Sequence, residues 1–289
     1  MLKLGIAGAG AMGGWFASLA GREGWEVYLF DLLPKRAEEL ARKIGGCRVA
    51  TLKELGEKAE ILLVAVPISK TPQVVEELAG MVGEEKLLMD IASVKGEVVR
   101  TMKGVKGRME LASLHPLFGP GAKDLKNKTV ISVPVKVGRR YEEFTRFLSS
   151  KGARVVEMGA EEHDRFMAVT QALTHFLLLS CAEALGELGF EEKLSTPLFS
   201  SLLQLVRASL ASDPLLCGEI QLLNPHSKEA RRKLVGIMEE LDRELSSGRM
   251  EKLRRILEHW GRKWRREVER AYEELYEEWE GRTPSGSNP

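Results

Sequence analysis

The sequence has little of what marks secreted, membrane-bound or nucleic-acid-binding proteins. Its three cysteines among 289 residues are odd in number and lie outside any metal-ligand spacing, so neither a disulfide framework nor a metal site is expected. The 43 basic and 42 acidic residues leave a net charge of +1, which gives no electrostatic attraction to nucleic acid or to an anionic membrane. No signal peptide is visible, and uninterrupted apolar stretches fall short of the roughly 18 residues of a membrane span. These absences predict a soluble, cytoplasmic protein.

Short apolar runs alternate with amphipathic segments in the first half of the chain. Two of the amphipathic segments, 34–44 and 71–82, have helical periodicity. The apolar runs, each predicted to be a strand, cover residues 4–7, 27–30, 61–66, 87–90, 110–114 and 129–133. Because strands that alternate with helices build βαβ units, residues 1–158 are predicted to form an α/β domain with a largely parallel sheet.

The region 159–280 has a different character, with only helical periodicity, and is predicted to be an all-α second domain. An apolar stripe from Phe166 to Ala184 predicts one long helix with a buried face. A second stripe includes Leu257, Trp260, Trp264 and Trp279. Core packing explains this second stripe most simply; a subunit interface is the alternative, and a homodimer is expected. The end of the chain, 281–289, has the composition of a disordered tail.

A glycine-rich loop directly after the first predicted strand is the sharpest local pattern. It consists of Gly8, Ala9, Gly10, Ala11, Met12 and Gly13. In this G-x-G-x-x-G pattern, Gly8 permits a tight turn, Gly10 lets the backbone approach a pyrophosphate, and Gly13 allows close packing of helix on strand. The positive end of the helix that follows faces the phosphates. Residues 1–158 are therefore predicted to be a Rossmann-type dinucleotide-binding domain.

Asp31 ends the second predicted strand at the spacing of about 20 residues where a carboxylate accepts hydrogen bonds from a ribose diol. Its charge would repel a 2′-phosphate, which favours NAD over NADP. Lys35 and Arg36 lie in the first turn of the helix that begins at Pro34. Their positive charges are either ordinary solvated groups or could tolerate a 2′-phosphate, so NADP stays a second possibility. Val66 and Pro67, at the end of another predicted strand, and Ser93, after the end of a further one, are assigned to the same cofactor site because ligands bind at the carboxyl ends of parallel strands.

Two further strand ends bring reactive residues to the same edge of the sheet. Ser93 lies in D-I-A-S-V-K (90–95) and His115 lies in S-L-H-P-L-F-G-P (113–120). A histidine at a strand end is more often structural than catalytic. Its position above a nucleotide site favours the catalytic interpretation here.

At these motifs the sequence resembles the prephenate dehydrogenase family. The resemblance continues through E-H-D-R-F-M (162–167), Q-A-L-T-H-F (171–176), L-S-T-P (194–197), Arg207, S-D-P (212–214) and Asn224. It covers roughly residues 1–230, and the order of the motifs is more specific than any one of them. The resemblance implies an NAD-dependent enzyme of tyrosine biosynthesis that converts prephenate, or arogenate, by coupled hydride transfer and decarboxylation.

The resemblance also implies a role for each matching residue. His115 would be the base that takes the proton of the substrate's ring hydroxyl, and Ser93 would hydrogen-bond that hydroxyl and orient His115. Gln171 and His175 would contact the substrate. Arg207 would grip a substrate carboxylate, for which its planar fork is suited.

Two other functions are compatible with parts of this pattern. The β-hydroxyacid dehydrogenases pair a similar glycine loop with a helical domain, but their catalytic lysine has no counterpart between residues 160 and 192. A dinucleotide-sensing protein without catalytic activity would keep the fold and leave Ser93, His115 and Arg207 without a role. Turnover of prephenate with NAD separates these possibilities.

Overall fold

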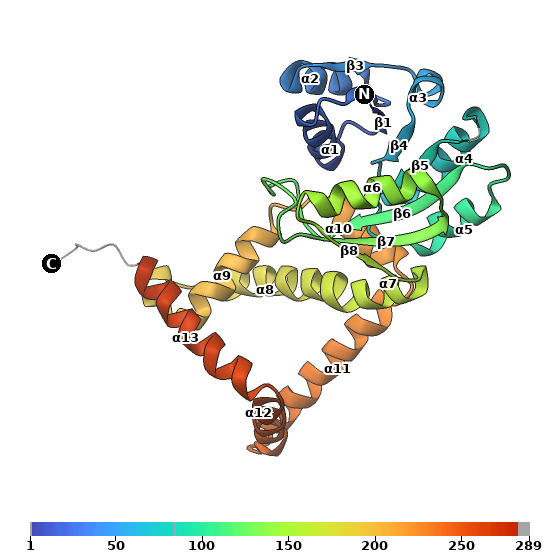
Figure 1. The fold of residues 1–289 in the computed structure, drawn as a ribbon. Helices are drawn as coiled ribbons and strands as arrows, with labels where there is room; N and C mark the ends of the chain where they lie inside the picture. The colour runs from blue at the N-terminus through green and yellow to red at the C-terminus, as the bar shows by residue number, and fades with distance from the viewer. Residues whose placement is uncertain (1, 84, 283–289) are drawn as a thin grey trace. The chain divides into compact units, whose positions relative to one another are not determined.

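The computed structural model describes residues 2–83 and 85–282 (Figure 1). The chain forms two compact units. The first comprises residues 1–168 together with 218–226, and the second comprises residues 169–217 together with 227–289. The predicted boundary at 158/159 differs from this division, because the helix that begins at Ala160 bonds to residues of the first unit.

An eight-stranded sheet forms the centre of the first unit. Its strands are β1 (Lys3–Ala7), β2 (Glu26–Phe30), β3 (Cys47–Val49), β4 (Ile61–Val64), β5 (Leu87–Asp90), β6 (Glu110–Pro116), β7 (Thr129–Lys136) and β8 (Arg154–Glu157). Their order is β3-β2-β1-β4-β5-β6-β7-β8, and only the pairing of β6 with β7 is antiparallel. The predicted α/β class with a largely parallel sheet is confirmed.

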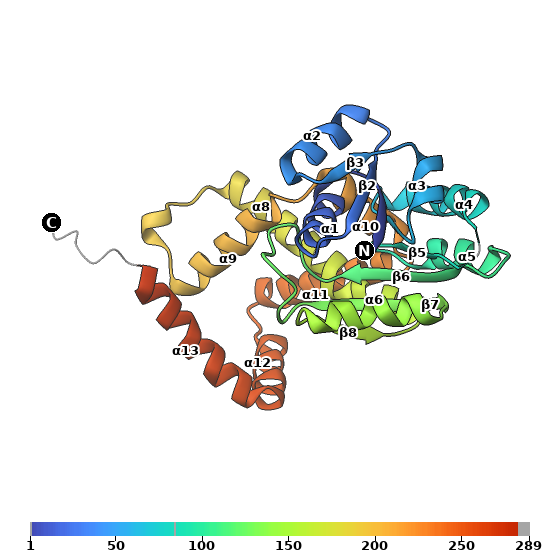
Figure 2. The same cartoon turned by 45° about the horizontal axis from the view of Figure 1, so that its top comes forward.

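Helices cover both faces of this sheet. They are α1 (Ala11–Arg22), α2 (Pro34–Ile44), α3 (Leu52–Lys58), η1 (Ile68–Lys70), α4 (Thr71–Met81), α5 (Gly96–Gly104), α6 (Arg139–Ser150) and α7 (Ala160–Met167). Side chains of α1, α2 and α6 share one hydrophobic core, and those of α3, α4 and α5 share the other. In Figure 2, α4 and α5 lie side by side.

The alternation of side chains along a strand explains why these strands are apolar throughout. In β4, Ile61 and Leu63 belong to one core, whereas Leu62 and Val64 belong to the other. A strand that is covered on both faces has no polar side, so it reads as a continuous apolar run. The two short edge strands β3 and β8 were not predicted, because three or four residues with exposed positions such as Arg48 leave no such run.

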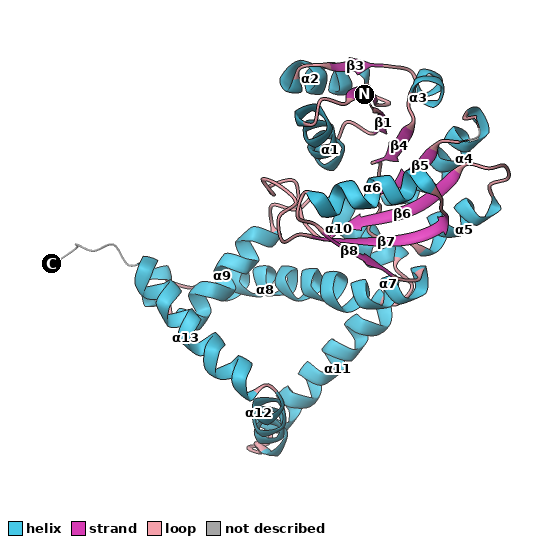
Figure 3. Cartoon of the chain, in the orientation of Figure 1, coloured by secondary structure: helices cyan, strands magenta, loops and turns pink. Residues whose placement is uncertain are grey.

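In the described part of the second unit, helices joined by loops are the only regular secondary structure, as Figure 3 shows, and this agrees with the predicted all-α domain. Its elements are η2 (Ala168–Leu173), α8 (Thr174–Leu188), η3 (Glu192–Leu194), α9 (Pro197–Ser209), α11 (Ser227–Ser246), α12 (Glu251–Lys263) and α13 (Arg265–Arg282), with the start of α10 (Pro214–Leu223). Helix α9 packs against α8 and α13. Helix α13 reaches Arg282, so the first two residues of the predicted tail are helical, and the rest of that prediction falls on 283–289, which lie outside the described residues.

The buried face predicted from Phe166 to Ala184 is wrong. Phe166 is 53% exposed and Val169 is 55% exposed. A π-helical segment, η2, interrupts the run and adds residues per turn, so positions spaced for an α-helix no longer share one face. The second stripe is also uncovered in the single chain: Trp264 is 50% exposed and stacks on Trp260. Core packing is therefore the wrong interpretation of that stripe, and the side chain of Trp279 is outside the described part.

By length and composition alone, the helical run Ala160–Leu188 meets the criterion for a membrane-spanning helix, with a mean hydropathy of 1.3 in its most apolar window. Only 17% of that window is buried. The expectation that no segment is long and apolar enough is wrong by this criterion. Polar residues such as Gln171 and His175 interrupt the apolar run in the sequence, but the mean hydropathy of the window stays high because apolar residues surround them. Apolar helices that pack against other helices share this length and composition.

Candidate active site

The glycine loop joins β1 to α1 at the carboxyl edge of the sheet. Gly8 has φ +110°, and a Cβ built there would lie 2.2 Å from the carbonyl oxygen of Ala65. A Cβ at Gly13 would lie 2.0 Å from the oxygen of Gly8. Both positions therefore exclude any side chain. A Cβ at Gly10 would meet nothing within 4 Å, so the backbone there is open to a ligand.

Helix α1 begins directly after Gly10, and no side chain caps its first turn. The backbone N–H groups of a helix start lack intrahelical partners and carry the positive end of the helix dipole. Ala11 is exposed, while Ala9 and Met12 are half-buried. An open, uncapped helix start next to a glycine that needs no side chain fits a pyrophosphate group.

Asp31 lies beside this loop, after the end of β2. Its Oδ2 accepts a hydrogen bond from the Ala9 N–H at 2.9 Å, and its Oδ1 accepts one from the Leu33 N–H at 2.9 Å. The carboxylate thus fixes the glycine loop, a role that the sequence did not predict. Each carboxylate oxygen has two lone pairs, so acceptor capacity for a ribose hydroxyl remains. Lys35 and Arg36 are exposed in the first turn of α2.

The loop after β4 lies against the glycine loop. A Cβ at Gly8 would approach Cγ1 of Val66 to 3.2 Å. Pro67 follows as an exposed residue and leads into η1 and α4. The structure thus brings Val66 next to the residues that were predicted to bind the dinucleotide.

The carboxyl ends of β5 and β6 lie side by side at the same edge. Asp90 pairs in register with Ser113, two residues before His115. His115 is buried and 4% exposed, and Ser93 is 9% exposed. Within the described residues, no hydrogen bond joins Ser93 to His115, so the role of Ser93 in orienting His115 stays a prediction.

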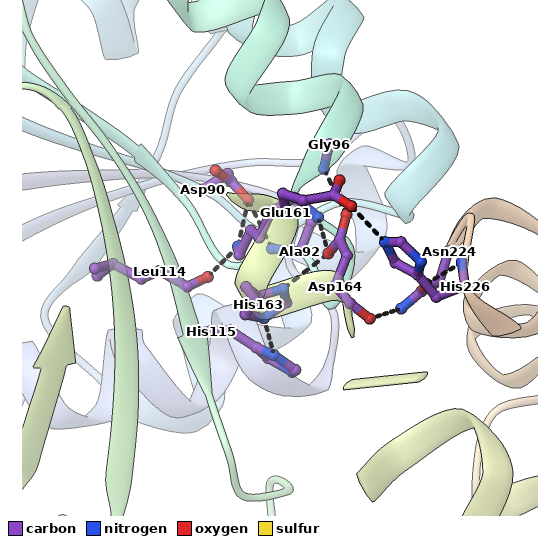
Figure 4. A network of polar contacts seen from close by, with 11 residues as sticks. Asp90, Ala92, Gly96, Leu114, His115, Glu161, His163, Asp164, Asn224 and His226 are labelled. Atoms are coloured by element: carbon purple, nitrogen blue, oxygen red, sulfur yellow. Dashed lines mark hydrogen bonds and ion pairs between the residues drawn. The ribbon is translucent and has the colours of Figure 1, made fainter. Parts of the chain in front are cut away.

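In the described structure a chain of two side chains, His163 and Asp164, orients His115 (Figure 4). His115 Nδ1 lies 2.8 Å from His163 Nε2, and His163 Nδ1 lies 2.8 Å from Asp164 Oδ1. His163 and Asp164 come from α7 and are almost completely buried. Two neighbouring residues of one helix therefore support the imidazole that ends β6.

The hydrogen-bond chain fixes which ring nitrogens carry protons. The Asp164 carboxylate only accepts: Oδ1 also receives the Lys95 N–H and Oδ2 the Gly96 N–H, each at 2.8 Å. His163 must therefore donate from Nδ1, which leaves its Nε2 as an acceptor in the neutral ring. His115 then donates from Nδ1. The neutral His115 ring consequently carries a lone pair on Nε2, the state required of a general base.

A buried ion pair lies behind this chain. Lys95 is fully buried, and its Nζ donates to Asp90 Oδ1 at 3.2 Å and to the carbonyl oxygen of Leu114 at 2.5 Å. Burial lowers the pKa of Lys95, while Asp90 acts in the opposite direction. A buried charge needs such a partner, since an unpaired one would be expensive to desolvate.

The surroundings of His115 favour its neutral form. Burial is the largest cause that lowers its pKa well below 6.5, and the nearby Lys95 and His163 lower it further. Burial also lowers the pKa of His163, although its hydrogen bond with Asp164 opposes this. The imidazole of His115 is thus held unprotonated at neutral pH.

The segment after α10 supports the same network. Asn224 Nδ2 donates to the carbonyl oxygen of Asp164 at 2.8 Å, and Asn224 Oδ1 accepts from the His226 N–H at 2.9 Å. His226 Nε2 lies 3.0 Å from Glu161 Oε1, as Figure 4 shows. This segment, 218–226, therefore belongs to the first unit although the chain on both sides of it belongs to the second.

The remaining predicted site residues belong to the second unit. His175 Nδ1 lies 3.7 Å from the Cys217 sulfur, and burial lowers the pKa of His175. Gln171 lies in the π-helical segment η2, and its side-chain oxygen is buried without a hydrogen-bond partner among the described residues. Both side chains are polar groups held in partly apolar surroundings, where a bound molecule could pair with them.

Arg207, predicted to grip a carboxylate, already binds one. Its Nη1 and Nη2 donate to Glu192 Oε1 and Oε2 at 2.9 and 2.8 Å. Both side chains are exposed, at 57% for Arg207 and 61% for Glu192. The guanidinium therefore presents its planar fork in the geometry of bidentate carboxylate recognition.

Several residues of the network stand in the sequence motifs but were not predicted to be catalytic or to bind a ligand. Asp90 and Lys95 frame the D-I-A-S-V-K motif, and His163 and Asp164 stand at the start of a helix. An aspartate that ends a strand and a lysine five residues later are a usable signal for a buried pair. The contact of Asp164 with Lys95 spans 69 residues and has no local signature.

Two family models match the chain. The model described as "Prephenate dehydrogenase, nucleotide-binding domain" matches residues 17–157, and the model described as "Prephenate dehydrogenase, dimerization domain" matches residues 159–259. Together they span both parts of the fold and all residues of the His115 network up to His226.

Curated relatives carry related names. A probable arogenate/prephenate dehydrogenase of Methanocaldococcus jannaschii is 30% identical over 244 residues, which are 82% of this chain and 55% of that protein. A 4-amino-4-deoxyprephenate dehydrogenase of Streptomyces pristinaespiralis is 29% identical over 240 residues, 79% of each chain. The chain thus spans about half the length of the first relative and most of the second.

The fold has close counterparts among solved structures. Prephenate dehydrogenase of Aquifex aeolicus, in complex with hydroxyphenyl propionate and NAD+, superposes with a TM-score of 0.71 at 23% identity. The superposition covers 95% of this chain and 98% of the other. The whole described architecture is therefore that of a known fold.

Proposed function

Because the chain belongs to the prephenate dehydrogenase family, we propose that it catalyses the oxidative decarboxylation of prephenate to 4-hydroxyphenylpyruvate, with hydride transfer to NAD. The observation that carries this proposal is the chain from Asp164 through His163 to His115. It leaves a lone pair on His115 Nε2 at the carboxyl edge of the sheet, the same edge that carries the glycine loop. A buried neutral imidazole whose proton is placed by a carboxylate has the state and the orientation of a general base.

His115 performs the proton step of the proposed reaction. Its Nε2 takes the proton of the ring hydroxyl while the carbon that bears the hydroxyl loses a hydride. The bond to the ring carboxylate then breaks, carbon dioxide leaves, and the electron pair completes the aromatic ring. His163 and Asp164 hold the imidazole and share the positive charge that it gains. Ser93, whose hydroxyl makes no hydrogen bond among the described residues, is available to the substrate hydroxyl.

The dinucleotide site fits the residues around the glycine loop. A bound nicotinamide would supply the hydride acceptor. Gly10 is open to a ligand, α1 is uncapped, and Asp31 can accept from a ribose hydroxyl. The Aquifex aeolicus enzyme of the same fold binds NAD+ in its crystal structure, which supports the same class of cofactor here.

NAD rather than NADP is proposed because the carboxylate of Asp31 would repel a 2′-phosphate. Replacement of Asp31 by serine or asparagine removes that charge, and the preference for NAD in kcat/KM should narrow. The exposed Lys35 and Arg36 then become available to a phosphate. Equal kcat/KM with both cofactors in the unaltered protein would refute this assignment.

Gln171, His175 and Arg207 are proposed to bind the substrate. Arg207 supplies a bidentate carboxylate site, and it already holds a carboxylate, that of Glu192. With Nδ1 beside the Cys217 sulfur, His175 is left with Nε2 for a substrate contact. Gln171 brings a buried side-chain oxygen that lacks a partner among the described residues.

A steady-state comparison of substrates tests the proposed function. Prephenate and arogenate differ in a keto or amino group on the side chain, and in 4-amino-4-deoxyprephenate an amino group replaces the hydroxyl whose proton His115 takes. Each should be assayed with NAD and with NADP. The highest kcat/KM with prephenate and NAD supports the proposal. Turnover of arogenate alone would correct the substrate, and no turnover of any of them would favour a dinucleotide-sensing protein.

The second unit is proposed to form a homodimer. The family model that matches residues 159–259 describes a dimerization domain. In the single chain, Leu257, Trp264 and Tyr272 expose half or more of their surface. Exposed aromatic and aliphatic side chains in such numbers are usual where a partner covers them.

Light scattering at several concentrations tests the dimer. The unaltered protein should have twice the monomer mass, and Trp264→Lys should lower the mass toward that of the monomer, because a charge would be buried at the interface. Arg262→Gln, two residues away, changes charge at an exposed position outside the stripe and should leave the mass unchanged. A concentration-independent monomer for the unaltered protein would overturn the assignment.

A further inference from the structure

Glu219 is a buried carboxylate that the sequence motifs did not include. It lies in α10 and is 8% exposed. Its Oε2 accepts the Ile68 N–H at 2.7 Å, and its Oε1 accepts the Ser69 N–H at 3.3 Å and the Ser69 hydroxyl. All three donors belong to the loop after β4, which lies 150 residues earlier in the chain. A carboxylate from a distant helix is thus the partner of this loop.

The position of that loop gives the contact its meaning. The Val66 side chain lies beside Gly8 of the glycine loop, and η1 begins two residues later, at Ile68. The N–H groups of Ile68 and Ser69 stand at a helical start, where no intrahelical acceptor reaches them and a negative charge is favoured. Without Glu219 the buried N–H of Ile68 would lose its acceptor, and the loop could leave its place against the glycine loop.

We infer that Glu219 is a positioning residue of the dinucleotide site: it holds Val66, Pro67 and the turn after them against the glycine loop. The inference rests on the proposed NAD site. It assigns to α10 an indirect role in cofactor affinity, although α10 is distant in sequence from every motif of the nucleotide-binding fold. Glu219 touches no reacting group in this arrangement; it acts through the loop.

If Glu219 only stabilised the fold, its replacement would not change cofactor affinity. Glu110 makes similar contacts far from the glycine loop and serves as a matched control. Glu110, the first residue of β6, accepts the Gly138, Arg140 and Tyr141 N–H groups at 3.0, 3.1 and 2.8 Å, at the start of α6. Because Glu110 begins its strand, it lies at the sheet edge opposite to the carboxyl ends. Glu110 and Glu219 each bind three donors at a helix start, but only Glu219 lies beside the glycine loop.

Direct measurement of NAD binding by calorimetry, without substrate, tests the inference. Glu219→Gln should raise the Kd for NAD by about tenfold, because the loop loses the charged acceptor that holds it beside the glycine loop. Ser69→Ala removes one donor of three and should raise the Kd less. Glu110→Gln should leave the Kd within about twofold of the unaltered protein, even if it lowers the melting temperature as much as Glu219→Gln.

Amide hydrogen exchange in the cofactor-free protein gives a second readout. Glu219→Gln should speed exchange at Ile68 and Ser69, and Glu110→Gln should not. An unchanged Kd in Glu219→Gln, or an equal loss of affinity in Glu110→Gln, overturns the inference. If the unaltered protein binds neither NAD nor NADP, the proposed cofactor itself is wrong. That outcome is distinct from failure of the inference about Glu219, which appears only when variants are compared with the unaltered protein.

Discussion

The polar groups of the first unit and those of the second are held in contrasting ways. At the sheet edge, Asp90, Lys95, His115, His163 and Asp164 are all buried, and each bonds to another member of one continuous network. In the second unit, Arg207 and Glu192 bind each other while more than half of each side chain is exposed. Most of the buried apolar side chains belong to the first unit, whereas large apolar side chains of the second unit are frequently exposed.

This contrast indicates what each unit needs in order to function. In the first unit, folding alone excludes water from the polar network, so the tautomer and charge state of His115 are fixed before any ligand binds. In the second unit, the charged and apolar groups are still exposed to water, which weakens their interactions. A bound substrate or a partner subunit would have to exclude this water. Chemistry is thus preorganised in one unit, and recognition is left open in the other.

The largest effect should come from removing the base. Asn at position 115 can hydrogen-bond to the substrate but cannot take its proton. For His115→Asn, kcat should fall by about 10²- to 10⁴-fold while KM changes little. The acidic limb of the pH–rate profile should disappear, and in the unaltered protein its midpoint should lie below about 6.5, because burial, Lys95 and His163 lower the pKa of His115. Near-normal kcat with an unchanged acidic limb would show that another group is the base.

Truncation of Arg207 should act on binding instead of chemistry. For Arg207→Ala, KM for the substrate should rise by about 10- to 150-fold, because the substrate carboxylate loses a charged hydrogen-bonding partner. The value of kcat should change far less than in His115→Asn. An unchanged KM would remove Arg207 from the substrate site and would leave its pair with Glu192 as a surface ion pair only.

Much of the first unit could be predicted because its signals are local. The helix Pro34–Ile44 begins and ends where its periodicity placed it, and the glycine loop lies between β1 and α1 as the motif requires. His115 could be placed because parallel strands bring their carboxyl ends to one edge. The partners of His115 could not, since Asp164 meets Lys95 across 69 residues of chain.

The second unit was harder to predict for a physical reason. Helical periodicity correctly gave an all-α region, but it assumes a constant number of residues per turn, and η2 breaks that assumption. Periodicity also cannot tell an apolar stripe that packs within the chain from one that packs against another chain. The exposure of Trp264 in the single chain is information that only the three-dimensional structure provides.

Acid should destabilise the buried network more than the exposed groups. The folded protein holds His115 and His163 with pKa values below 6.5, whereas the unfolded chain binds protons near the ordinary value of about 6.5. The unfolded state therefore takes up more protons as pH falls below about 6.5, and the free energy of unfolding decreases by up to about 1.4 kcal/mol per pH unit for each such histidine. Above that pH this contribution is constant.

Urea unfolding between about pH 5 and 7.5 measures this dependence. His115→Asn should reduce the slope below about pH 6.5, since one buried neutral imidazole is gone. His259→Asn is the matched control, because His259 is exposed and its replacement should leave the slope unchanged. Equal slopes in all three proteins would mean that the buried histidines do not control acid stability.

The smallest effect should come from Glu192, whose carboxylate occupies the fork that the substrate is proposed to enter. An exposed ion pair is weak because water screens it, so a substrate carboxylate has little to displace. Glu192→Gln should therefore lower KM by at most about fivefold and leave kcat unchanged, and added salt should shrink the difference because it screens exposed charges. Glu191→Gln makes the same charge change one residue away, where the carboxylate pairs with Lys193, and should leave KM as it is. A rise in KM for Glu192→Gln would mean that Glu192 orients Arg207 for the substrate instead of competing with the substrate carboxylate. The substrate-binding groups of the second unit would then also be preorganised before the substrate binds.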